Sequence, residues 1–455
     1  MISVNKTNII ILATNEEIPI HFNKQSNLYL LAGKPIFQYI IETALLLKAK
    51  KIFYVYNYNI KNTRLNFINH SIHYIFQSKK IENQNIIKEI IYKLEDNEKI
   101  LILHANIPLL KLKTLKKLMK IKLKNGIGLI SKNKFYSKNY NTTNDLNNNN
   151  IINFSTKKIK NKKHIKNIYN GILIIKNKIL KKFINKKYER EKNKSFIIKI
   201  LQSAYEEGLF IDTIISNNLF ETYAVNNLFE LISLERMYQK ELAKNLLLSG
   251  VKIQDPNRFD LRGTLKYDNH VIIDSNVIIE GNVFLGKNVH IHTGCFLKNC
   301  VIQDNTVIYP FSIIEGSNIL HSCNIGPFAH LRTGSKINNK AKIGNFVEIK
   351  NTSLGINTQV SHMSYLGDST IGSNVNIGAG TITCNYNGIK KFKTIIEDDV
   401  FIGSDSQLIA PIKIEKNATI GAGTTVTNNV KKNELVLSRI KQKHIRNWKN
   451  KFKKE

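Results

Sequence analysis

Residues 271–297 read VIIDSNVIIEGNVFLGKNVHIHTGCFL, and an aliphatic side chain returns at every sixth position of this stretch. A period of six matches neither the 3.6-residue turn of a helix nor the two-residue alternation of a strand. It is typical of a coil of short strands with one inward aliphatic side chain on each face and small or polar residues at the corners. The aliphatic positions are Ile273, Ile279, Leu285, Ile291 and Leu297.

The same repeat extends over nearly all of the second half of the chain. Because stacked coils bury a continuous aliphatic column that an isolated repeat cannot form, the pattern predicts a left-handed parallel β-helix of hexapeptide repeats. The flat faces of such a prism favour association around a threefold axis, so we expect a homotrimer. With a few five-residue steps and one interruption, the further aliphatic positions are Ile302, Ile308, Ile314, Leu320, Ile325, Leu331, Ile337, Ile343, Ile349, Leu354, Val360, Leu366, Ile371, Ile377, Ile396, Ile402, Leu408, Ile414, Ile420 and Val426.

The first half of the chain follows a different pattern. Short apolar runs such as residues 9–12 alternate with segments of helical spacing such as residues 36–47. Strands that alternate with helices are typical of βαβ units in a parallel, doubly wound sheet. Residues 227–248 carry apolar side chains at helical spacing and indicate a helical arm. We therefore expect an α/β, Rossmann-like domain over residues 1–227, a helical linker over 228–250 and the β-helix with a basic tail over 251–455.

Bulk composition argues against several classes of protein. No apolar run approaches the ~18 residues of a membrane span, and residues 9–13 are too short for a signal-peptide core, so we expect a cytoplasmic protein. Lys, Asn and Ile dominate together, as A/T-rich codons would produce, and this accounts for the net charge of +34. Nucleic acid is not an expected partner, because aromatic residues do not interleave with the basic runs.

The cysteines indicate neither disulfides nor a zinc site. No two of them form a Cys-x-x-Cys pair, and nothing else in the sequence indicates secretion, so we expect free thiols. The four are Cys295, Cys300, Cys323 and Cys384.

Two Gly-Ala-Gly triplets, at residues 378–380 and 421–423, fall on positions of the six-residue repeat. Glycine there leaves backbone N–H groups open to an elongated ligand such as the pantetheine arm of acetyl-CoA. The repeat breaks at residues 383–393, which we expect to form a loop outside the coils. These features predict an acyl-CoA site on the prism.

Basic and titratable side chains near these triplets suit acyl transfer to an amine. The ammonium group of an amino sugar must lose a proton before it can attack a thioester, and His362 is the candidate base because histidine side chains titrate near neutral pH. Glu348 can orient His362. The side chains of Arg332, Lys350 and Lys391 can bind a sugar phosphate. Each of these residues alone is more often a structural or solvated side chain; it is the group that predicts the chemistry.

Several motifs carry a resemblance to a known family. Residues 344–350 read GNFVEIK, residues 362–368 read HMSYLGD and residues 374–386 read NVNIGAGTITCNY. Residues 255–264 (DPNRFDLRGT) and 402–406 (IGSDS) fit the same pattern. With these motifs the chain resembles, over essentially its whole length, the bifunctional N-acetylglucosamine-1-phosphate uridyltransferase/glucosamine-1-phosphate acetyltransferase family.

The resemblance implies an enzyme that acetylates glucosamine 1-phosphate with acetyl-CoA and then couples the product to UTP. The final product, UDP-N-acetylglucosamine, serves peptidoglycan and lipopolysaccharide precursors. The Ala379 N–H is implied to lie near the developing oxyanion. The residues implied are His362 as general base; Arg332, Lys350 and Lys391 at the phosphate; Tyr365 and Asn376 at the sugar; and Ala379, Asn385, Tyr386, Ser404, Ala422 and Arg439 along acetyl-CoA.

By the same resemblance the first domain is nucleotidyltransferase-like, but most of the family's site residues are replaced. Leu12, Ala13 and Gln77 keep the family's identities as a residual nucleotide-sugar site. Asn106 stands where the family has an aspartate that binds magnesium, whereas Asn227, the family's second metal ligand, is retained. A hard dication prefers a carboxylate to a neutral amide.

The phosphate-binding loop after the first strand is also altered. Its glycine positions hold Asn15 and Glu17, its arginine position holds Pro19 and its lysine position holds Ser26. The carboxylates of Glu16 and Glu17 repel phosphates where the family has none. We therefore predict that uridyl transfer is lost and that magnesium is needed only if this site still works.

Three alternatives remain beside this interpretation. The first is a fully bifunctional enzyme that also makes UDP-N-acetylglucosamine from UTP. The second is a β-helix carbonic anhydrase, whose zinc ion would need three converging histidines, with His290 and His292 already close in sequence. The third is a basic binding or assembly protein without enzyme activity.

Overall fold

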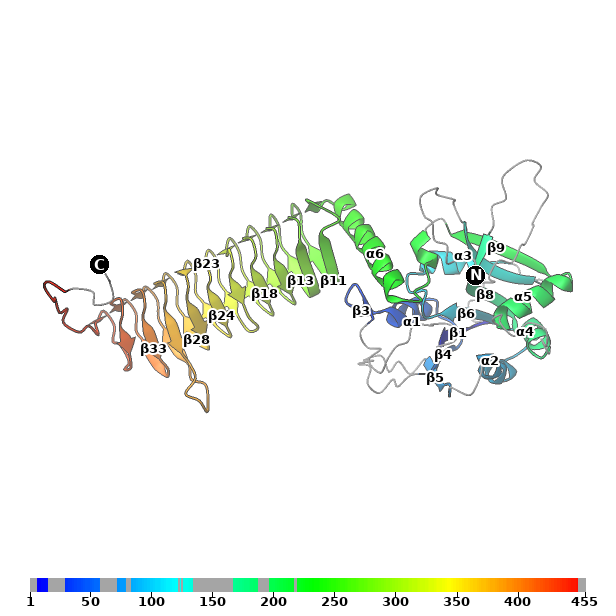
Figure 1. Cartoon of the computed structure of the whole chain (residues 1–455), viewed down its shortest axis with the longest axis horizontal. Helices are drawn as coiled ribbons and strands as arrows, with labels where there is room; N and C mark the ends of the chain where they lie inside the picture. Colours follow the sequence, from blue (N-terminus) through cyan, green and yellow to red (C-terminus); the bar gives the residue numbers. More distant parts are fainter. Residues whose placement is uncertain are drawn as a thin grey trace, which may run out of the picture. The chain divides into compact units, whose positions relative to one another are not determined.

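The structure is a computed structural model that divides into two compact units, residues 1–238 and 239–455 (Figure 1). It describes residues 6–14, 29–57, 72–78, 83–121, 123, 126–133, 167–186, 196–216 and 219–448. Each unit has its own hydrophobic core. None of the helices in these ranges is long and apolar enough to cross a membrane.

A seven-stranded sheet with the strand order β5-β4-β1-β6-β8-β7-β9 forms the centre of the first unit. β1 is parallel to β4 and β6, as expected for βαβ units. β8 runs antiparallel to β6 and β7, so the sheet is mixed and not parallel throughout. The strands are β1 (Thr7–Ala13), β4 (Ile52–Tyr56), β5 (Ile72–Phe76), β6 (Lys99–His104), β7 (Gly126–Asn133), β8 (Asn167–Lys176) and β9 (Phe210–Ser216), beside a short hairpin of β2 (Leu30–Leu31) and β3 (Lys34–Pro35).

Helices cover both faces of this sheet. In β1, Ile9 and Ile11 pack into a core with α1 and α3, whereas Ile10 and Leu12 pack with α2, α4 and α5 on the other face. Because alternate side chains of a strand point to opposite faces, a strand covered on both sides is apolar throughout. The helices are α1 (Ile36–Leu46), α2 (Asn83–Tyr92), α3 (Leu112–Met119), α4 (Asn177–Ile184) and α5 (Phe196–Glu206), and a 3-10 turn spans Leu219–Thr222.

The boundary between the two units falls within α6 (Leu228–Leu248). Tyr238 belongs to the first unit and packs edge-on against Tyr39, with 5.9 Å between the ring centroids. The next residue, Gln239, is buried in the second unit. Its Nε2 donates to the carbonyl oxygen of Leu261 over 3.0 Å, and the N–H of Leu261 donates to its Oε1 over 2.9 Å. Neighbouring residues of one helix are therefore anchored in different cores.

The second unit is a left-handed parallel β-helix, which confirms the prediction from the six-residue repeat (Figure 1). One sheet contains β10 (Lys252–Ile253), β12 (Ile272–Ile273), β14 (His290–Ile291), β17 (Val307–Ile308), β20 (Asn324–Ile325), β23 (Lys342–Asn345), β26 (Gln359–His362), β29 (Asn376–Ile377), β32 (Phe401–Ile402), β35 (Thr419–Ile420) and β37 (Leu435–Val436). The strands of the remaining faces are β11 (Phe259–Tyr267), β13 (Val277–Leu285), β15 (Phe296–Lys298), β16 (Val301–Ile302), β18 (Ile313–Glu315), β19 (Asn318–Ile319), β21 (His330–Leu331), β22 (Lys336–Ile337), β24 (Glu348–Lys350), β25 (Ser353–Leu354), β27 (Tyr365–Gly367), β28 (Ser369–Ile371), β30 (Ile382–Cys384), β31 (Thr394–Ile396), β33 (Gln407–Ile409), β34 (Ile412–Ile414) and β36 (Thr425–Val426).

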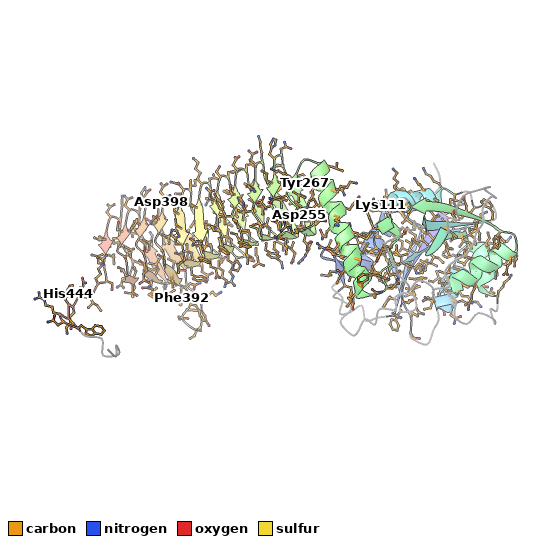
Figure 2. The ribbon with its side chains drawn as sticks, turned by 45° about the horizontal axis from the view of Figure 1, so that its top comes forward. Lys111, Asp255, Tyr267, Phe392, Asp398 and His444 are labelled. Carbon is orange, nitrogen blue, oxygen red and sulfur yellow. The ribbon has the colours of Figure 1, made fainter. Side chains whose placement is uncertain are left out.

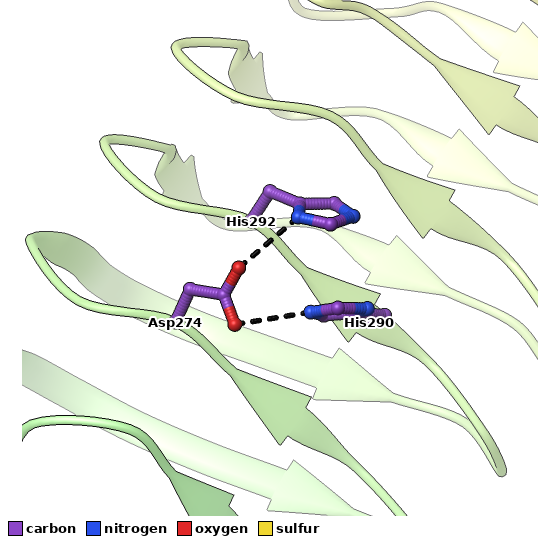
Figure 3. A group of neighbouring side chains, drawn as sticks. All are labelled: Asp274, His290 and His292. Carbon is purple, nitrogen blue, oxygen red and sulfur yellow. Dashed lines mark hydrogen bonds and ion pairs between the residues drawn. The ribbon is translucent and has the colours of Figure 1, made fainter.

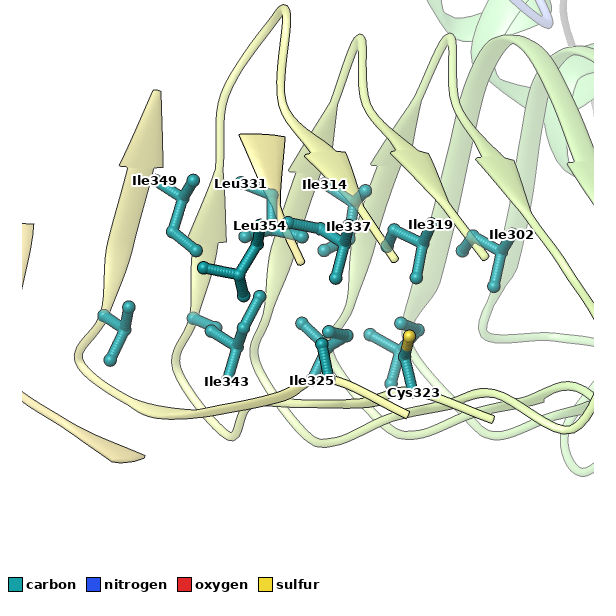
Figure 4. Close-up of a cluster of buried hydrophobic side chains, with 14 of the residues drawn as sticks. Ile302, Ile314, Ile319, Cys323, Ile325, Leu331, Ile337, Ile343, Ile349 and Leu354 are labelled. Carbon is teal, nitrogen blue, oxygen red and sulfur yellow. The ribbon is translucent and has the colours of Figure 1, made fainter. Parts of the chain in front are cut away.

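The aliphatic residues of the repeat form columns inside the coils (Figure 4). In one column Ile302 pairs with Ile319, which in turn pairs with Ile337 in the next coil. The prediction that Leu320 points inward at this position is wrong, because Ile319 is fully buried and Leu320 is only half-buried. The five-residue step occurs one repeat earlier than expected, between Ile314 and Ile319, so Ile319 takes the inward position that was predicted for Leu320.

Asparagine occupies many corners of the coils. Asn288, Asn305, Asn357 and Asn374 have backbone φ angles of +57° to +58°. This left-handed conformation is costly for most side chains but is tolerated by asparagine, which accounts for the polar residues between the aliphatic positions. The side chains also bond from coil to coil, since Asn288 Nδ2 donates to Asn305 Oδ1 over 2.9 Å.

All four cysteines are free thiols, as expected. Burial raises the pKa of Cys295 and Cys323 to about 11 and that of Cys300 to about 12. These three thiols stay protonated at neutral pH, and they behave as small apolar side chains of the core.

Candidate functional site

Three neighbouring strands of the β-helix, β21, β24 and β27, position the predicted phosphate and sugar residues. Leu331 of β21 and the middle residues of β24 and β27 point into the core, so the residues on either side of them point outward. Glu348 pairs with Tyr365, and Lys350 pairs with Gly367 in the next coil. Arg332 follows β21, and its N–H donates to the carbonyl oxygen of Ile349 over 2.8 Å. The repeat therefore places these polar side chains on one outer face.

Three cations come together at this face. The contact with Lys391 holds the pKa of Lys350 below its ordinary value, and the charge of Arg332 acts in the same direction. Crowded cations repel one another unless an anion lies between them. A phosphate group bound here would remove that repulsion and accept hydrogen bonds from all three side chains.

Glu348 does not orient His362 as the sequence suggested. Its Oε1 accepts a hydrogen bond from Arg332 Nη1 over 2.7 Å, and this ion pair raises the pKa of Arg332. The physical reason is the pairing of coils. Glu348 lies on the outer face beside Arg332, whereas His362 ends β26, which belongs to the other sheet. Glu348 therefore holds the arginine in place.

The partner of His362 is Asn345, a residue that the sequence reasoning missed. His362 Nδ1 lies 2.7 Å from Asn345 Oδ1, and the two residues are paired in adjacent coils. An amide oxygen can only accept a hydrogen bond, so in the neutral ring this contact favours the tautomer with the proton on Nδ1 and the lone pair on Nε2. The side chain is exposed, so Nε2 is accessible to a substrate. The signal that could have found Asn345 is its spacing of 17 residues, one coil, from His362.

The interruption of the repeat forms a loop between β30 and β31, as predicted. Figure 2 shows Phe392 standing away from the stacked coils. At the base of the loop, Nδ2 of the buried Asn385 donates a hydrogen bond to Asp368 Oδ2 over 2.6 Å. The Asn385 carbonyl oxygen accepts a hydrogen bond from the Phe392 N–H over 2.9 Å. A backbone bridge between Tyr386 and Lys391 closes the loop, while the Tyr386 ring is exposed. Asp368, which the sequence reasoning did not identify as a site residue, therefore anchors the segment that brings Lys391 to Lys350.

Tyr365 and Asn385 approach each other over Gly367. A Cβ atom at Gly367 would lie 2.5 Å from the Tyr365 hydroxyl and 2.8 Å from Asn385 Nδ2, so any larger residue would displace these two side chains. The predicted sugar residue Asn376 lies in β29 and pairs with Gln359 of β26. It is therefore on the strand next to the one that ends in His362.

The predicted acetyl-CoA residues Ala379, Ser404 and Ala422 occupy one corner in successive coils. The Asp405 N–H donates to the Ala379 carbonyl oxygen over 2.7 Å, and the Gly423 N–H donates to that of Ser404 over 2.8 Å. Within residues 219–448 and the other described segments, the Ala379 N–H donates no hydrogen bond, so it can serve a ligand. The exposed Arg439 reaches the same corner, with Nη2 3.6 Å from the position of a Cβ at Gly421.

In the first unit, the retained residues lie at the carboxyl ends of parallel strands. Leu12 and Ala13 are buried at the end of β1, and Gln77 is buried directly after β5. Such ends are the usual ligand-binding edge of an open α/β sheet. The loop residues Asn15, Glu16, Glu17, Pro19 and Ser26 lie outside the described residues.

The two predicted metal-site residues have other contacts. Asn106 Nδ2 donates to Asn226 Oδ1 over 3.2 Å. Asn227 Oδ1 accepts from the Glu230 N–H over 2.9 Å, and Glu230 Oε2 accepts from the Asn226 N–H over 2.6 Å. This reciprocal pattern caps the start of α6. Asn227 therefore has a structural function here whether or not a metal binds.

Two protein-family patterns match the second unit. Residues 261–336 match the GMPPB C-terminal domain, and residues 393–428 match the bacterial transferase hexapeptide family (six repeats). The coils and their outer face thus define an enzyme of the hexapeptide-repeat transferase class. This confirms the prediction of a transferase and argues against the non-enzyme alternative.

Relatives match the chain over nearly its full length. The bifunctional protein GlmU of Baumannia cicadellinicola subsp. Homalodisca coagulata is 44% identical over 459 residues, 99% of this chain and 98% of the relative. The bifunctional protein GlmU of Wigglesworthia glossinidia brevipalpis is 41% identical over 91% of this chain and 92% of its own. The chain therefore belongs to the GlmU family. Among solved structures, the 4-diphosphocytidyl-2C-methyl-D-erythritol synthase of Anaerococcus prevotii matches with 12% identity and a TM-score of 0.37 over 52% of this chain and 100% of that protein.

The predicted loss of uridyl transfer is not supported by these relatives. Both are named bifunctional, and the matches include the first unit. The bifunctional alternative fits them at least as well as a chain with one activity. The carbonic anhydrase alternative needs three converging histidines and has no support. Among the described residues, the third side chain that lies beside His290 and His292 is Asp274 and not a histidine.

Proposed function

We propose that the β-helix transfers the acetyl group of acetyl-CoA to the amine of glucosamine 1-phosphate, giving N-acetylglucosamine 1-phosphate for UDP-N-acetylglucosamine synthesis. The observation that carries this proposal is the gathering of Arg332, Lys350 and Lys391 at one outer face of the coils, where Tyr365 of β27 follows His362 by three residues in the same coil. An amine base beside a phosphate-binding group matches an amino-sugar phosphate. Membership of the GlmU family supports the same substrate.

The chemistry follows from the hydrogen bond of His362. With its ring proton directed at Asn345, Nε2 can take a proton from the substrate ammonium group. The free amine then attacks the thioester carbonyl, and the sulfur of CoA leaves as a thiolate. The Ala379 N–H is available to stabilise the oxyanion that forms during the attack. Arg332, Lys350 and Lys391 would hold the phosphate and so orient the amine.

The acetyl-CoA path is proposed to follow the corner of Ala379, Ser404 and Ala422. A Cβ atom at Gly378 would lie 2.5 Å from the Ser404 N, which shows how tightly this corner is stacked. Small side chains along such a column allow a narrow pantetheine arm to reach the backbone. Arg439 would pair with the phosphates of CoA at the end of the column.

The first prediction concerns the phosphate of the acceptor. With glucosamine 1-phosphate as acceptor, we expect release of CoA from acetyl-CoA. With glucosamine, which lacks the phosphate, kcat/KM should be at least about 100-fold lower, because a charged hydrogen bond contributes about 1.5–3 kcal/mol. Lys391→Ala should raise KM for the phosphate substrate by about 10–100-fold. A thiol-reactive dye that follows CoA measures both effects.

Lys390→Ala is the matched control for this experiment. Lys390 belongs to the same loop, but its ammonium lies over the Phe392 ring, 5.1 Å from the centroid. Its loss is expected to leave KM unchanged within a factor of two or so. Equal kcat/KM values for glucosamine and its phosphate would contradict the proposed substrate.

The second prediction concerns assembly. We propose a homotrimer, because the flat outer faces of a β-helix are suited to association around a threefold axis. Light scattering of the full chain is expected to give about three times the 52.2 kDa of one chain. A monomer with full acetyl-transfer activity would contradict this proposal. The cytoplasmic location stays a prediction from the sequence.

The second candidate function is uridyl transfer by the first unit. What supports it is the match of bifunctional relatives over this unit, together with Leu12, Ala13 and Gln77 at the ligand-binding edge. Asn106 and Asn227 offer neutral amide oxygens, and one of these already accepts a hydrogen bond, so this donor pair fits a magnesium ion poorly. We propose that the chain is bifunctional, with a second reaction slowed at Asn106.

A further inference from the structure

Two histidines and an aspartate converge near the start of the β-helix, far along the coils from His362 in β26. β12 and β14 are parallel neighbours, with Ile273 paired to Ile291. Ile291 is fully buried, so His290 and His292 on either side of it both point outward. Asp274 directly follows β12 and therefore lies beside His292 in the adjacent coil. The repeat itself brings the three side chains together.

The three side chains face one another closely (Figure 3). His290 Nε2 is 3.0 Å from Asp274 Oδ1, and His292 Nδ1 is 3.0 Å from Asp274 Oδ2. The two imidazole rings stack, with 3.9 Å between their centroids. One nitrogen of each ring and an oxygen of the carboxylate all lie within 4.8 Å of one another. The side chains are only 20–30% exposed, so the group is partly shielded from water.

This donor set matches a transition-metal ion. Bonds of about 2.0–2.1 Å in a tetrahedral site place neighbouring ligand atoms about 3.3–3.4 Å apart. To reach this geometry the two imidazole rings, now stacked at 30°, must turn apart so that a lone pair in the plane of each ring meets the ion. Two neutral imidazoles and one carboxylate suit zinc, whereas calcium and magnesium prefer oxygen ligands alone. Each nitrogen that now faces the carboxylate would exchange its proton for the metal.

We propose that Asp274, His290 and His292 form a zinc site that braces two neighbouring coils, with a fourth position open to water. Zinc would replace two hydrogen bonds by three metal–ligand bonds between the same coils. Tyr309 of the following coil stacks on His292 at 5.4 Å and 5°, which restricts the orientation of that ring. Ligands that neighbouring groups hold in place bind metal more tightly.

Other histidine–carboxylate pairs on the coils provide a comparison. His321 Nδ1 lies 3.6 Å from Asp304, and His330 Nε2 lies 3.4 Å from Glu315. Each of these pairs contains a single histidine. Across the described segments, Asp274, His290 and His292 are the one group of three side chains whose donor atoms converge.

The test is zinc binding by the full-length protein. Chelator-treated protein is dialysed against increasing zinc, and bound metal is measured by mass spectrometry. Saturation at about one zinc per chain is expected, and cobalt in place of zinc should give the visible absorption of a tetrahedral nitrogen–oxygen site. His290→Gln and His292→Gln should each weaken binding at least about 10–100-fold, and Asp274→Asn should weaken it in the same direction.

His321→Gln is the matched control, and it should leave zinc affinity unchanged. Acetyl transfer, which uses other coils, verifies that every variant is folded. Absence of saturable binding to the wild-type protein, or an affinity that His290→Gln/His292→Gln does not alter, would show that the three side chains form hydrogen bonds only and would overturn the proposal. Because metal content is read directly, failure here is distinguishable from failure of the proposed acetyl transfer.

Discussion

His362→Ala is expected to lower kcat for acetyl transfer by about 10²–10⁴-fold, the usual contribution of a positioned general base. Alanine leaves no group that can take the proton from the substrate ammonium, while the phosphate-binding cations and the acetyl-CoA corner stay intact. Binding of acetyl-CoA, measured by calorimetry, should therefore hardly change. The measurement is the rate of CoA release at saturating substrates.

Asn345→Ala separates the base from its orientation. Without the amide oxygen, the His362 ring loses the hydrogen bond that selects its tautomer, and we expect a smaller fall in kcat, about 10-fold. His321→Ala, whose imidazole faces Asp304 on coils away from the site, is the control and should retain full activity. If His362→Ala kept more than half of the wild-type kcat, the general-base assignment would be wrong.

Asn106→Asp is expected to raise magnesium-dependent uridyl transfer about 10²–10³-fold. A carboxylate restores the charge that a hard dication prefers. We take its effect to be similar to that of one oxyanion-hole donor, about 2.7–4 kcal/mol of transition-state stabilisation. The reaction is followed as pyrophosphate release from UTP and N-acetylglucosamine 1-phosphate. We expect slow but measurable release from the wild-type chain.

Two results would contradict this prediction in different ways. No pyrophosphate from either protein would mean that the altered loop, with Glu17 and Pro19, has abolished the activity. Equal, rapid release from both would mean that the metal is held without a carboxylate at position 106. Thermal unfolding of the first unit, followed by circular dichroism, controls for folding, because acetyl transfer depends on the other unit and reports only on that one.

The β-helix was predictable because its signal is repeated and local. Each aliphatic position of the repeat has the same environment, so one pattern specifies every coil. The error at Leu320 occurred where Ile319 and Leu320 are adjacent and either can point inward. Which of them does so depends on the register of the neighbouring coils, since Ile319 must pair with both Ile302 and Ile337.

The site was predictable in its residue types but not in its contacts. His362, Lys350 and Lys391 were found from motifs, and the structure brings Lys350 and Lys391 together as expected. The partners were assigned less well. Glu348 precedes His362 by less than one coil and faces Arg332, 16 residues before it, whereas Asn345 bonds to His362 over 17 residues, one full coil. In a β-helix the informative separation is one coil, about 17 residues, and not proximity in the sequence.

The amino-acid sequence by itself determined that the second half forms coils, because the six-residue repeat of aliphatic side chains can be buried in no other way. It also determined the kinds of chemistry available on the surface. Only the tertiary structure decided which of these side chains meet. Stacking aligns residues about one coil apart, so Asn345 reaches His362, and Asp274 reaches His290 and His292. The physical reason is that each coil is held to the next by backbone hydrogen bonds whose register depends on every five-residue step before it.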